Sequence, residues 1–372
     1  MSDCIYCGKS AGLFKEKHKE CEKAFQTGNE NILELISIYP KNEDSLEDFQ
    51  NKLSAICPKS YISEEVKNET ILKGMLTELG NFINQKKIDL IQLKKFFELI
   101  YYLNLKNQLS KNVSYINLIT FISEKISDLI SVNFFSQEIV KIETDINLVC
   151  GQLRLDSSFK NTTLIKSLEK AIYKSLDDGV ITEVEEESIK EFIDHFQLSV
   201  DKLSNSKAYS KLVKSLILRD IFNGNLPKRI QITNQVPFNL QKNETLIWLI
   251  NGVDYYTDKV RREYVGRTQG VSLRIVKGVY YRLGEFKGHP VDTVEKIYLG
   301  RGILGFTNKQ LYFFNSQTSF RIRYDKIISV SPSSNGFTII KDGVTAKPQA
   351  FIDGDGWFSY NLITNLSQID LK

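Results

Sequence analysis

Four residues near the start of the chain have the types and spacing of metal ligands. Cys4 and Cys7 form a C-x2-C pair, and His18 and Cys21 follow to complete the pattern C-x2-C-x10-H-x2-C. Thiolate sulfur and imidazole nitrogen are donors that Zn²⁺ prefers, and four of them fill a tetrahedral shell. Because such a shell leaves no position for a reactive water, the pattern predicts one structural zinc ion per chain.

The residues between the two pairs are expected to position the ligands. Gly8, directly after the first pair, permits the tight turn that a cysteine knuckle needs. We predict a helix over residues 15–24, in whose first turns the second pair would share one face. Leu13 and Phe14 are expected to supply a small hydrophobic platform for the site. The alternative is that these cysteines have no ligand role.

The arrangement resembles a short treble-clef zinc finger over residues 4 to about 26. In that class the ion replaces a core too small to fold alone. Treble clefs bind nucleic acids, proteins or nothing, so the resemblance does not choose a partner. Three of the five cysteines lie in the first 21 residues, which suits metal binding better than a disulfide framework. Cys57 and Cys150 are expected to be small buried side chains.

The other residues with chemical potential do not form a catalytic set. His195 is expected to be a partly exposed helical residue, and His289 to lie in a turn. Asp353 and Asp355 fit helix capping better than acid–base catalysis. The sequence has no G-x-S-x-G elbow, no phosphate-binding loop and no H-E-x-x-H helix. We therefore expect a protein that is not an enzyme, with an unrecognised active site as the alternative.

The composition is ordinary for a globular protein. Of 372 residues, 42% are hydrophobic and 25% charged, which is too apolar for disorder, and the length suggests two or three domains. No apolar stretch approaches the roughly 20 residues that a spanning helix needs. The first residues also lack the apolar run of a signal peptide. We expect a cytoplasmic protein, with peripheral attachment to a membrane as a further option.

The first two-thirds of the chain have the apolar period of amphipathic helices. Residues 71–122 align with residues 164–216 at an offset of 93 residues, which becomes 94 after one insertion. Apolar positions agree and surface positions do not, as two copies of one helical packing unit would show. We place the copies at about 64–130 and 160–225. Chance agreement between amphipathic stretches is the alternative.

The connector between the first two helices of the second copy resembles that of TerB-like (tellurite-resistance type) helical domains. Thr182 and Glu185 are expected to form a capping box there. Read as an EF-hand loop, the segment has Lys174 and a leucine at ligand positions, so we expect no calcium. The resemblance implies metal binding through acidic clusters, for which the matching residues here are Asp177 and Asp178.

The last third has the alternating pattern of strands. Its expected order is strands, a hairpin near Thr307, more strands and a final helix capped by Asp355. The segments 305–313 and 322–327 resemble bacterial pleckstrin-homology-like (PH-like) and GRAM domains, which are binding modules for lipid headgroups or protein segments. Residues 271–291 look like an inserted hairpin. The helix is expected to plug the bent sheet with four apolar residues, Phe358, Leu362, Ile363 and Leu366.

Charge is unevenly distributed along the chain. Residues 226–372 carry 20 Lys and Arg against 12 Asp and Glu, whereas the remainder carries 29 against 33. Within the basic part, cationic side chains gather near the inserted hairpin and could meet phosphates of a membrane surface or a nucleic acid. Outward-facing charges of a solvated hairpin are the alternative. The candidate ligand-binding residues are Arg261, Arg262, Arg267, Arg274, Lys277, Arg282 and Lys287.

These patterns predict a multidomain α+β protein in three parts. A zinc finger over residues 1–28 precedes an all-α region with an internal duplication over 29–225 and a β-rich PH-like domain closed by a helix over 226–372. The predicted function is non-catalytic binding, as an adaptor whose PH-like module docks on an anionic membrane surface or a protein partner. A nucleic-acid-binding protein that uses the finger and the basic hairpin is the alternative, and an enzyme is the second alternative.

Overall fold

The structure is a computed structural model in two compact units. It describes residues 2–84, 89–177, 180–199, 203, 206–229, 236–259, 262–265, 268–276, 279–286, 289–292, 295–343 and 346–368, with the side chains of 258–296 left out. One unit, the helical unit, comprises Met1–Ala171 and Phe192–Leu198. The other, the sheet unit, comprises Ile172–Glu191 and Ser199–Lys372. The described residues form an α+β fold, while the predicted three-part division stays a prediction.

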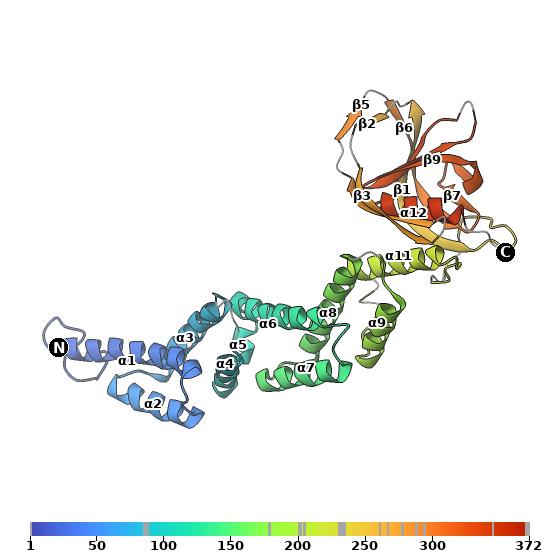
Figure 1. The fold of residues 1–372 in the computed structure, drawn as a ribbon. Helices are drawn as coiled ribbons and strands as arrows, with labels where there is room; N and C mark the ends of the chain where they lie inside the picture. Colours follow the sequence, from blue (N-terminus) through green and yellow to red (C-terminus); the bar gives the residue numbers. More distant parts are fainter. Residues whose placement is uncertain are drawn as a thin grey trace. The chain divides into compact units, whose positions relative to one another are not determined.

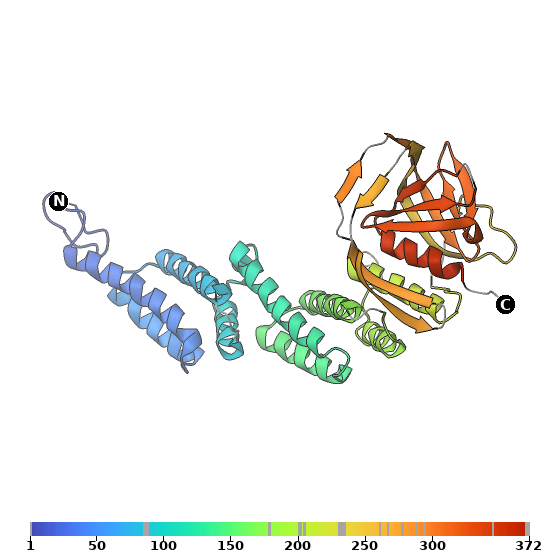
Figure 2. The same ribbon diagram turned by 45° about the horizontal axis from the view of Figure 1, so that its top comes forward.

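Helices make up the first part of the chain (Figures 1 and 2). Short polar side chains begin several of them, as helix N-termini require: Ser45 and Asp48 form a capping box, and Asn112 and Ser206 each accept a bond from a backbone N–H. None of the described helices is long and apolar enough to cross a bilayer. The helices are α1 (Lys19–Ile38), α2 (Leu46–Lys59), α3 (Glu64–Asn84), α4 (Leu90–Tyr102), α5 (Lys106–Leu109), α6 (Val113–Val132), α7 (Ile139–Leu153), α8 (Ser157–Asp177), α9 (Glu183–His195) and α11 (Lys207–Phe222).

The two aligned segments each supply three long helices, α3, α4 and α6 in the first and α8, α9 and α11 in the second. Several equivalent apolar positions are buried in both, as the helical period requires. Met75 and Leu79 of α3, and their counterparts Leu168 and Ile172 of α8, are all fully buried. The duplication itself stays a prediction.

A seven-stranded antiparallel sheet forms the C-terminal part of the sheet unit. Its order is β8-β7-β6-β1-β11-β10-β9, so the first strand pairs with the last and consecutive hairpins extend on either side. Helix α12 (Gly356–Leu366) follows the sheet and packs against β9 and β10 (Figure 1). The strands are β1 (Leu246–Lys259), β6 (Glu295–Thr307), β7 (Gln310–Phe314), β8 (Ser319–Arg323), β9 (Ile327–Ser333), β10 (Gly336–Lys341) and β11 (Gln349–Ile352).

The core of the sheet unit is filled by aromatic side chains and two helices. Asp355 caps α12 by accepting a bond from the Phe358 backbone N–H at 3.2 Å, as predicted. The four residues of the predicted apolar face of α12 are all buried, so that prediction is also confirmed. Helix α11 contributes to the same core through Ile217 and Phe222, although no sequence pattern predicts this contact.

The predicted insertion lies between β1 and β6. Strand β2 (Arg262–Val265) pairs with β5 (His289–Asp292), and β3 (Thr268–Val276) pairs with β4 (Val279–Phe286) as a hairpin between them. The predicted hairpin is therefore present, with different bounds. The expected turn at His289 is wrong, because this residue begins β5 and pairs with Val265.

Candidate metal centre

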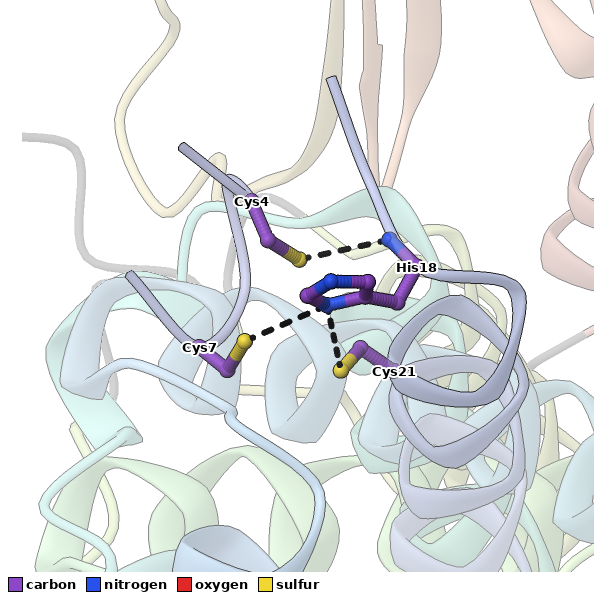
Figure 3. A group of neighbouring side chains, drawn as sticks. All are labelled: Cys4, Cys7, His18 and Cys21. Carbon is purple, nitrogen blue, oxygen red and sulfur yellow. Dashed lines mark hydrogen bonds between the residues drawn. The ribbon is translucent and has the colours of Figure 1, made fainter. Parts of the chain in front are cut away.

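The N-terminal segment forms a loop that brings the four predicted ligands together (Figure 3). One ligand atom from each of Cys4, Cys7, His18 and Cys21 lies within 4.8 Å of every other. In Figure 3 the three sulfur atoms surround one edge of the imidazole ring. These four side chains could hold a metal ion such as Zn²⁺.

A tight backbone turn places the first pair. The N–H of Gly8 donates to the carbonyl of Cys4 at 2.9 Å, and the N–H of Cys4 donates to the carbonyl of Lys9 at 2.8 Å. Gly8 has a φ of 67°, in the left-handed region that glycine adopts without steric cost. A Cβ atom here would meet nothing within 4 Å, so the glycine serves the turn and not a close contact.

The second pair lies at the beginning of α1. His18 is its N-cap with extended backbone angles, and Cys21 lies in the first turn. The predicted helix over residues 15–24 therefore begins later than expected, and the prediction that both ligands share a helix face is wrong for His18. The reason is local, because the carbonyl of Glu16 accepts a bond from the Ile5 N–H at 3.0 Å and closes the loop before the helix starts.

Hydrogen bonding identifies the ligand nitrogen of His18. Its Nδ1 lies 3.4 Å from the sulfur of Cys7 and 3.6 Å from that of Cys21, whereas its Nε2 lies 3.1 Å from the carbonyl oxygen of Ser10. A carbonyl can only accept, so Nε2 donates to Ser10, and Nδ1 is the ring nitrogen that faces the sulfur atoms and could serve as the metal ligand. Metal-ligating histidines are oriented in this way by a partner on the other ring nitrogen.

The backbone also prepares a thiolate. Burial tends to raise the pKa of Cys4, but backbone N–H groups of Cys7, His18 and Tyr6 outweigh it and lower that pKa to about 6. Burial and the neighbouring Cys7 sulfur raise the pKa of Cys21. Three thiolates this close repel one another unless a cation lies among them, which is the role a divalent ion would fill.

The predicted hydrophobic platform is wrong. Leu13 is 70% exposed and Phe14 is 98% exposed, so neither packs beneath the site. The small apolar cluster instead contains Ala11 with the buried ligands Cys4 and Cys21. Tyr6 packs against this cluster, and its ring lies 4.9 Å from that of Phe25 on α1.

Tyr61 also lies at this site, although no sequence pattern predicts it. It lines the same surface hollow as His18 and Cys21. Its interaction with the Cys21 thiol is the main reason why the pKa of Tyr61 is raised. Nothing in the sequence links a tyrosine after α2 to a metal ligand in α1.

The other candidate residues lie apart from the metal centre in the sequence and in structural role. His195 ends α9 and contacts Glu143 at 2.8 Å, partly exposed as predicted. Thr182 and Glu185 form the predicted capping box, with the Glu185 N–H donating to Thr182 Oγ1 at 3.2 Å. Cys150 is buried as predicted, whereas Cys57 is only half-buried. Asp177 ends α8, and Asp178 lies outside the described residues.

The basic cluster near the insertion is only partly described. Arg262, Arg274 and Arg282 belong to β2, β3 and β4, but their side chains are outside the description. The other four members, Arg261, Arg267, Lys277 and Lys287, lie outside the described residues altogether. Their predicted contact with phosphates stays a prediction.

Comparisons with known proteins assign no family. No protein-family model matches the chain, and no curated protein matches it. Among solved structures, one of Vav1 inhibited by an allosteric inhibitor is similar over 95% of this chain and 85% of that chain, at 9% identity and a TM-score of 0.21. A likeness this low carries no argument about fold or function.

Proposed function

We propose that this chain is a non-catalytic interaction protein with a structural zinc ion at its N-terminus. The observation that carries this proposal is the set of four donor atoms within 4.8 Å of one another. Three thiolates and one neutral imidazole complete a tetrahedral shell, so the ion would fasten the loop to α1 and activate no water. Calcium prefers oxygen ligands, and this donor set offers none.

The proposal assigns a PH-like binding role to the C-terminal sheet and α12. Its support is the strand order, in which β6-β7-β8 and β11-β10-β9 extend as antiparallel hairpins from either side of β1. Helices α11 and α12 pack on the same core, in which Phe313 and Phe351 are fully buried. A rigid core of this kind leaves loops and sheet edges free to bind a partner.

The charge of this module favours an anionic partner. Residues 226–372 carry 20 basic against 12 acidic side chains. We therefore propose docking on an acidic membrane surface, or on an acidic protein segment. An excess of positive charge attracts both by the same Coulombic force, which salt screens.

Co-sedimentation of the full chain with vesicles tests the membrane arm. The membrane arm is supported if the chain binds phosphatidylcholine vesicles that contain phosphatidylserine, does not bind vesicles without phosphatidylserine, and is released at high salt. If the chain binds neither kind of vesicle, the membrane arm is wrong and an acidic protein segment remains the proposed partner. Tight salt-sensitive binding to DNA or RNA, with no vesicle binding, would favour the nucleic-acid alternative instead.

Metal analysis of the purified full chain tests the zinc site. We expect about one equivalent of zinc per chain, lost in Cys4→Ser and retained in the matched control Cys57→Ser, whose sulfur lies outside the site. Well under one equivalent in the native chain, together with a Cys4→Ser variant that folds normally, would remove the structural ion from the proposal.

A further inference from the structure

The loop that carries the metal ligands also presents two adjacent apolar side chains to solvent. Leu13 is 70% exposed and Phe14 is 98% exposed. Burial of large apolar side chains is favourable, and neighbouring ones that stay exposed mark interaction sites. These residues and Gly12 form what we call the apolar tip (residues 12–14), which the described part of the chain leaves uncovered.

Hydrogen bonds to a single residue hold both ends of the apolar tip. Before it, the N–H of Ala11 donates to the carbonyl of Ser2 at 3.0 Å. After it, the carbonyl of Lys15 accepts from the hydroxyl of the same Ser2 at 2.6 Å. Because the tip is only the short stretch 12–14 between these two anchors, it has little conformational freedom to lose when it binds a partner.

The backbone of the apolar tip is unusual for a bulky residue. Gly12 has a φ of 95° and Phe14 a φ of 64°, so both lie in the left-handed region. Glycine adopts this region freely, but a large side chain is strained there. A phenylalanine that is both strained and exposed does not stabilise the loop. Its presence is explained if the ring serves in binding.

Lysines flank the apolar tip in the sequence. Residues 9–19 carry four lysines against one acidic residue. One of the four, Lys17, pairs with Glu22 of α1. Within the described part of the chain, the other three are exposed and have no carboxylate partner: Lys9, Lys15 and Lys19. Apolar side chains flanked by free ammonium groups match the surface of an acidic bilayer, in which the apolar groups enter the acyl boundary and the lysines stay among the headgroups.

We propose that the apolar tip inserts into the interface of an acidic lipid bilayer through Leu13 and Phe14. The flanking lysines contact the anionic headgroups. This inference goes beyond the proposed function, because it assigns a bilayer contact to the helical unit, whereas that function assigns one to the PH-like module of the sheet unit. A short tip held at both ends inserts at a small cost in conformational entropy.

Fluorescence of the full chain carrying Phe14→Trp tests insertion directly. With phosphatidylcholine vesicles that contain phosphatidylserine, the emission added to that of the native chain should shift to shorter wavelength. Lipids brominated on their acyl chains should quench it, because an inserted indole leaves water. Leu129→Trp on α6 is the control, since Leu129 is 70% exposed like Leu13, and it should show neither change. Unshifted and unquenched emission from Phe14→Trp would overturn the proposal, and an apolar pocket of a protein partner would then be what the tip fits.

Co-sedimentation with the same vesicles measures what the apolar side chains contribute. Leu13→Ser and Phe14→Ser should each weaken binding about tenfold, because a large apolar side chain no longer leaves water. The matched control is Leu129→Ser, which should bind as the native chain does. Both tip side chains are exposed, so their variants should keep the melting temperature and the zinc content of the native chain. Equal vesicle affinity for the tip variants and the control would refute insertion.

Lys15→Gln tests the acidic headgroups as the partner. It keeps the apolar tip and should weaken binding to the phosphatidylserine vesicles about fivefold at low salt, as loss of one basic residue near an anionic surface does. Lys141→Gln on the exposed side of α7 is the control, and equal effects of the two substitutions would contradict the headgroup contact.

Failure of this inference is distinguishable from failure of the proposed function. If the PH-like module does not bind lipid, the Phe14→Trp variant still shows the shift and the quenching with vesicles. If the chain binds vesicles but that variant shows neither change, the module keeps its role and the insertion of the apolar tip is refuted.

Discussion

Helices α6 and α11 occupy the same place in the two aligned segments but present opposite chemistry on one face. At the 94-residue offset, α6 has Ser123, Glu124, Ser127 and Asp128 where α11 has Ile217, Leu218, Ile221 and Phe222. The spacing of these positions places them together on one side of a helix. Helices at equivalent positions of the two segments therefore pack against different partners.

The polar face of α6 packs against α8. Ser127 Oγ lies 3.1 Å from the carbonyl of Thr163, and Ser123 Oγ lies 2.9 Å from the Thr163 hydroxyl. Both serines are buried. At the edge of this contact, Lys170 Nζ lies 2.6 Å from Glu124 and 2.7 Å from Asp128. Small hydroxyl side chains let two helices approach closely while satisfying their own hydrogen bonds.

The apolar face of α11 packs against a sheet instead. Ile217, Leu218, Ile221 and Phe222 all belong to the core that includes the aromatic residues of the strands. A sheet surface offers broad apolar area, and large side chains fill the space between it and a helix. At equivalent positions, large apolar side chains of α11 therefore face the sheet core, whereas small hydroxyl side chains of α6 face another helix.

A second difference concerns charge. Glu186 of α9 is buried and pairs with Arg219 of α11, and Arg229 Nη1 also lies 2.7 Å from its carboxylate. At the 93-residue offset, the first segment has Leu93 at this position, which is buried as well. The second segment therefore has a buried ion cluster at a position where the first segment has a buried apolar side chain.

The largest effect is expected from truncating the apolar face. Phe222→Ala removes a fully buried ring from the core of the sheet unit and should lower the free energy of unfolding by about 4 kcal/mol. Urea denaturation of the full chain measures this, with Leu129→Ala as control because Leu129 is exposed on α6. A loss below about 1 kcal/mol would show that α11 does not depend on the sheet.

The ion cluster predicts a specific pH dependence. Burial tends to raise the pKa of Glu186, but Arg229, Lys190 and Arg219 outweigh it and lower the pKa from 4.5 to about 2. A lowered pKa means stability that is present above the unfolded value and lost as the pH falls from about 4.5 to about 2, on the order of 3 kcal/mol. Glu186→Gln should lack this component, so equal pH profiles for the variant and the native chain would contradict the pairing.

The sequence predicted those elements whose signals are local. Three features depend only on spacing within one short segment: the four candidate metal ligands, the Thr182–Glu185 capping box and the apolar face of α12. The structure brings the four ligands together, forms the capping box and buries the apolar face, as predicted. Periodicity likewise identifies helices and strands, because burial on one face dictates it.

What the sequence did not predict depends on contacts between distant segments. The apolar face of α11 has the same pattern whether a helix or a sheet covers it, so its place in the sheet core could not be inferred. Tyr61 lines the hollow at the metal centre although it follows α2, and the close approach of its neighbours Ser60 and Ile62 to α1 appears in the sequence only as Gly28. Leu13 and Phe14 were expected to pack, but the loop closes before α1 begins and leaves them exposed.

A smaller effect is expected at the buried hydroxyls of α6. Ser127→Ala removes the bond to the Thr163 carbonyl without adding volume and should cost about 1 kcal/mol in the free energy of unfolding. Thr120→Ala on the exposed side of the same helix is the control and should change little. If both substitutions have equal effects by urea denaturation, the hydroxyls do not stabilise the contact between α6 and α8.

The smallest effect is expected at the edge of that contact. Lys170 bridges Glu124 and Asp128, but its side chain is 32% exposed, so solvent and salt screen the attraction. Lys170→Ala should cost less than about 1 kcal/mol at low salt and still less in 1 M NaCl, whereas Lys141→Ala on the exposed side of α7 should show no such salt dependence. A large cost that persists in high salt would mean that Lys170 acts through the packing of its aliphatic stem, and the α6–α8 contact would then depend on apolar burial as the α11 contact does.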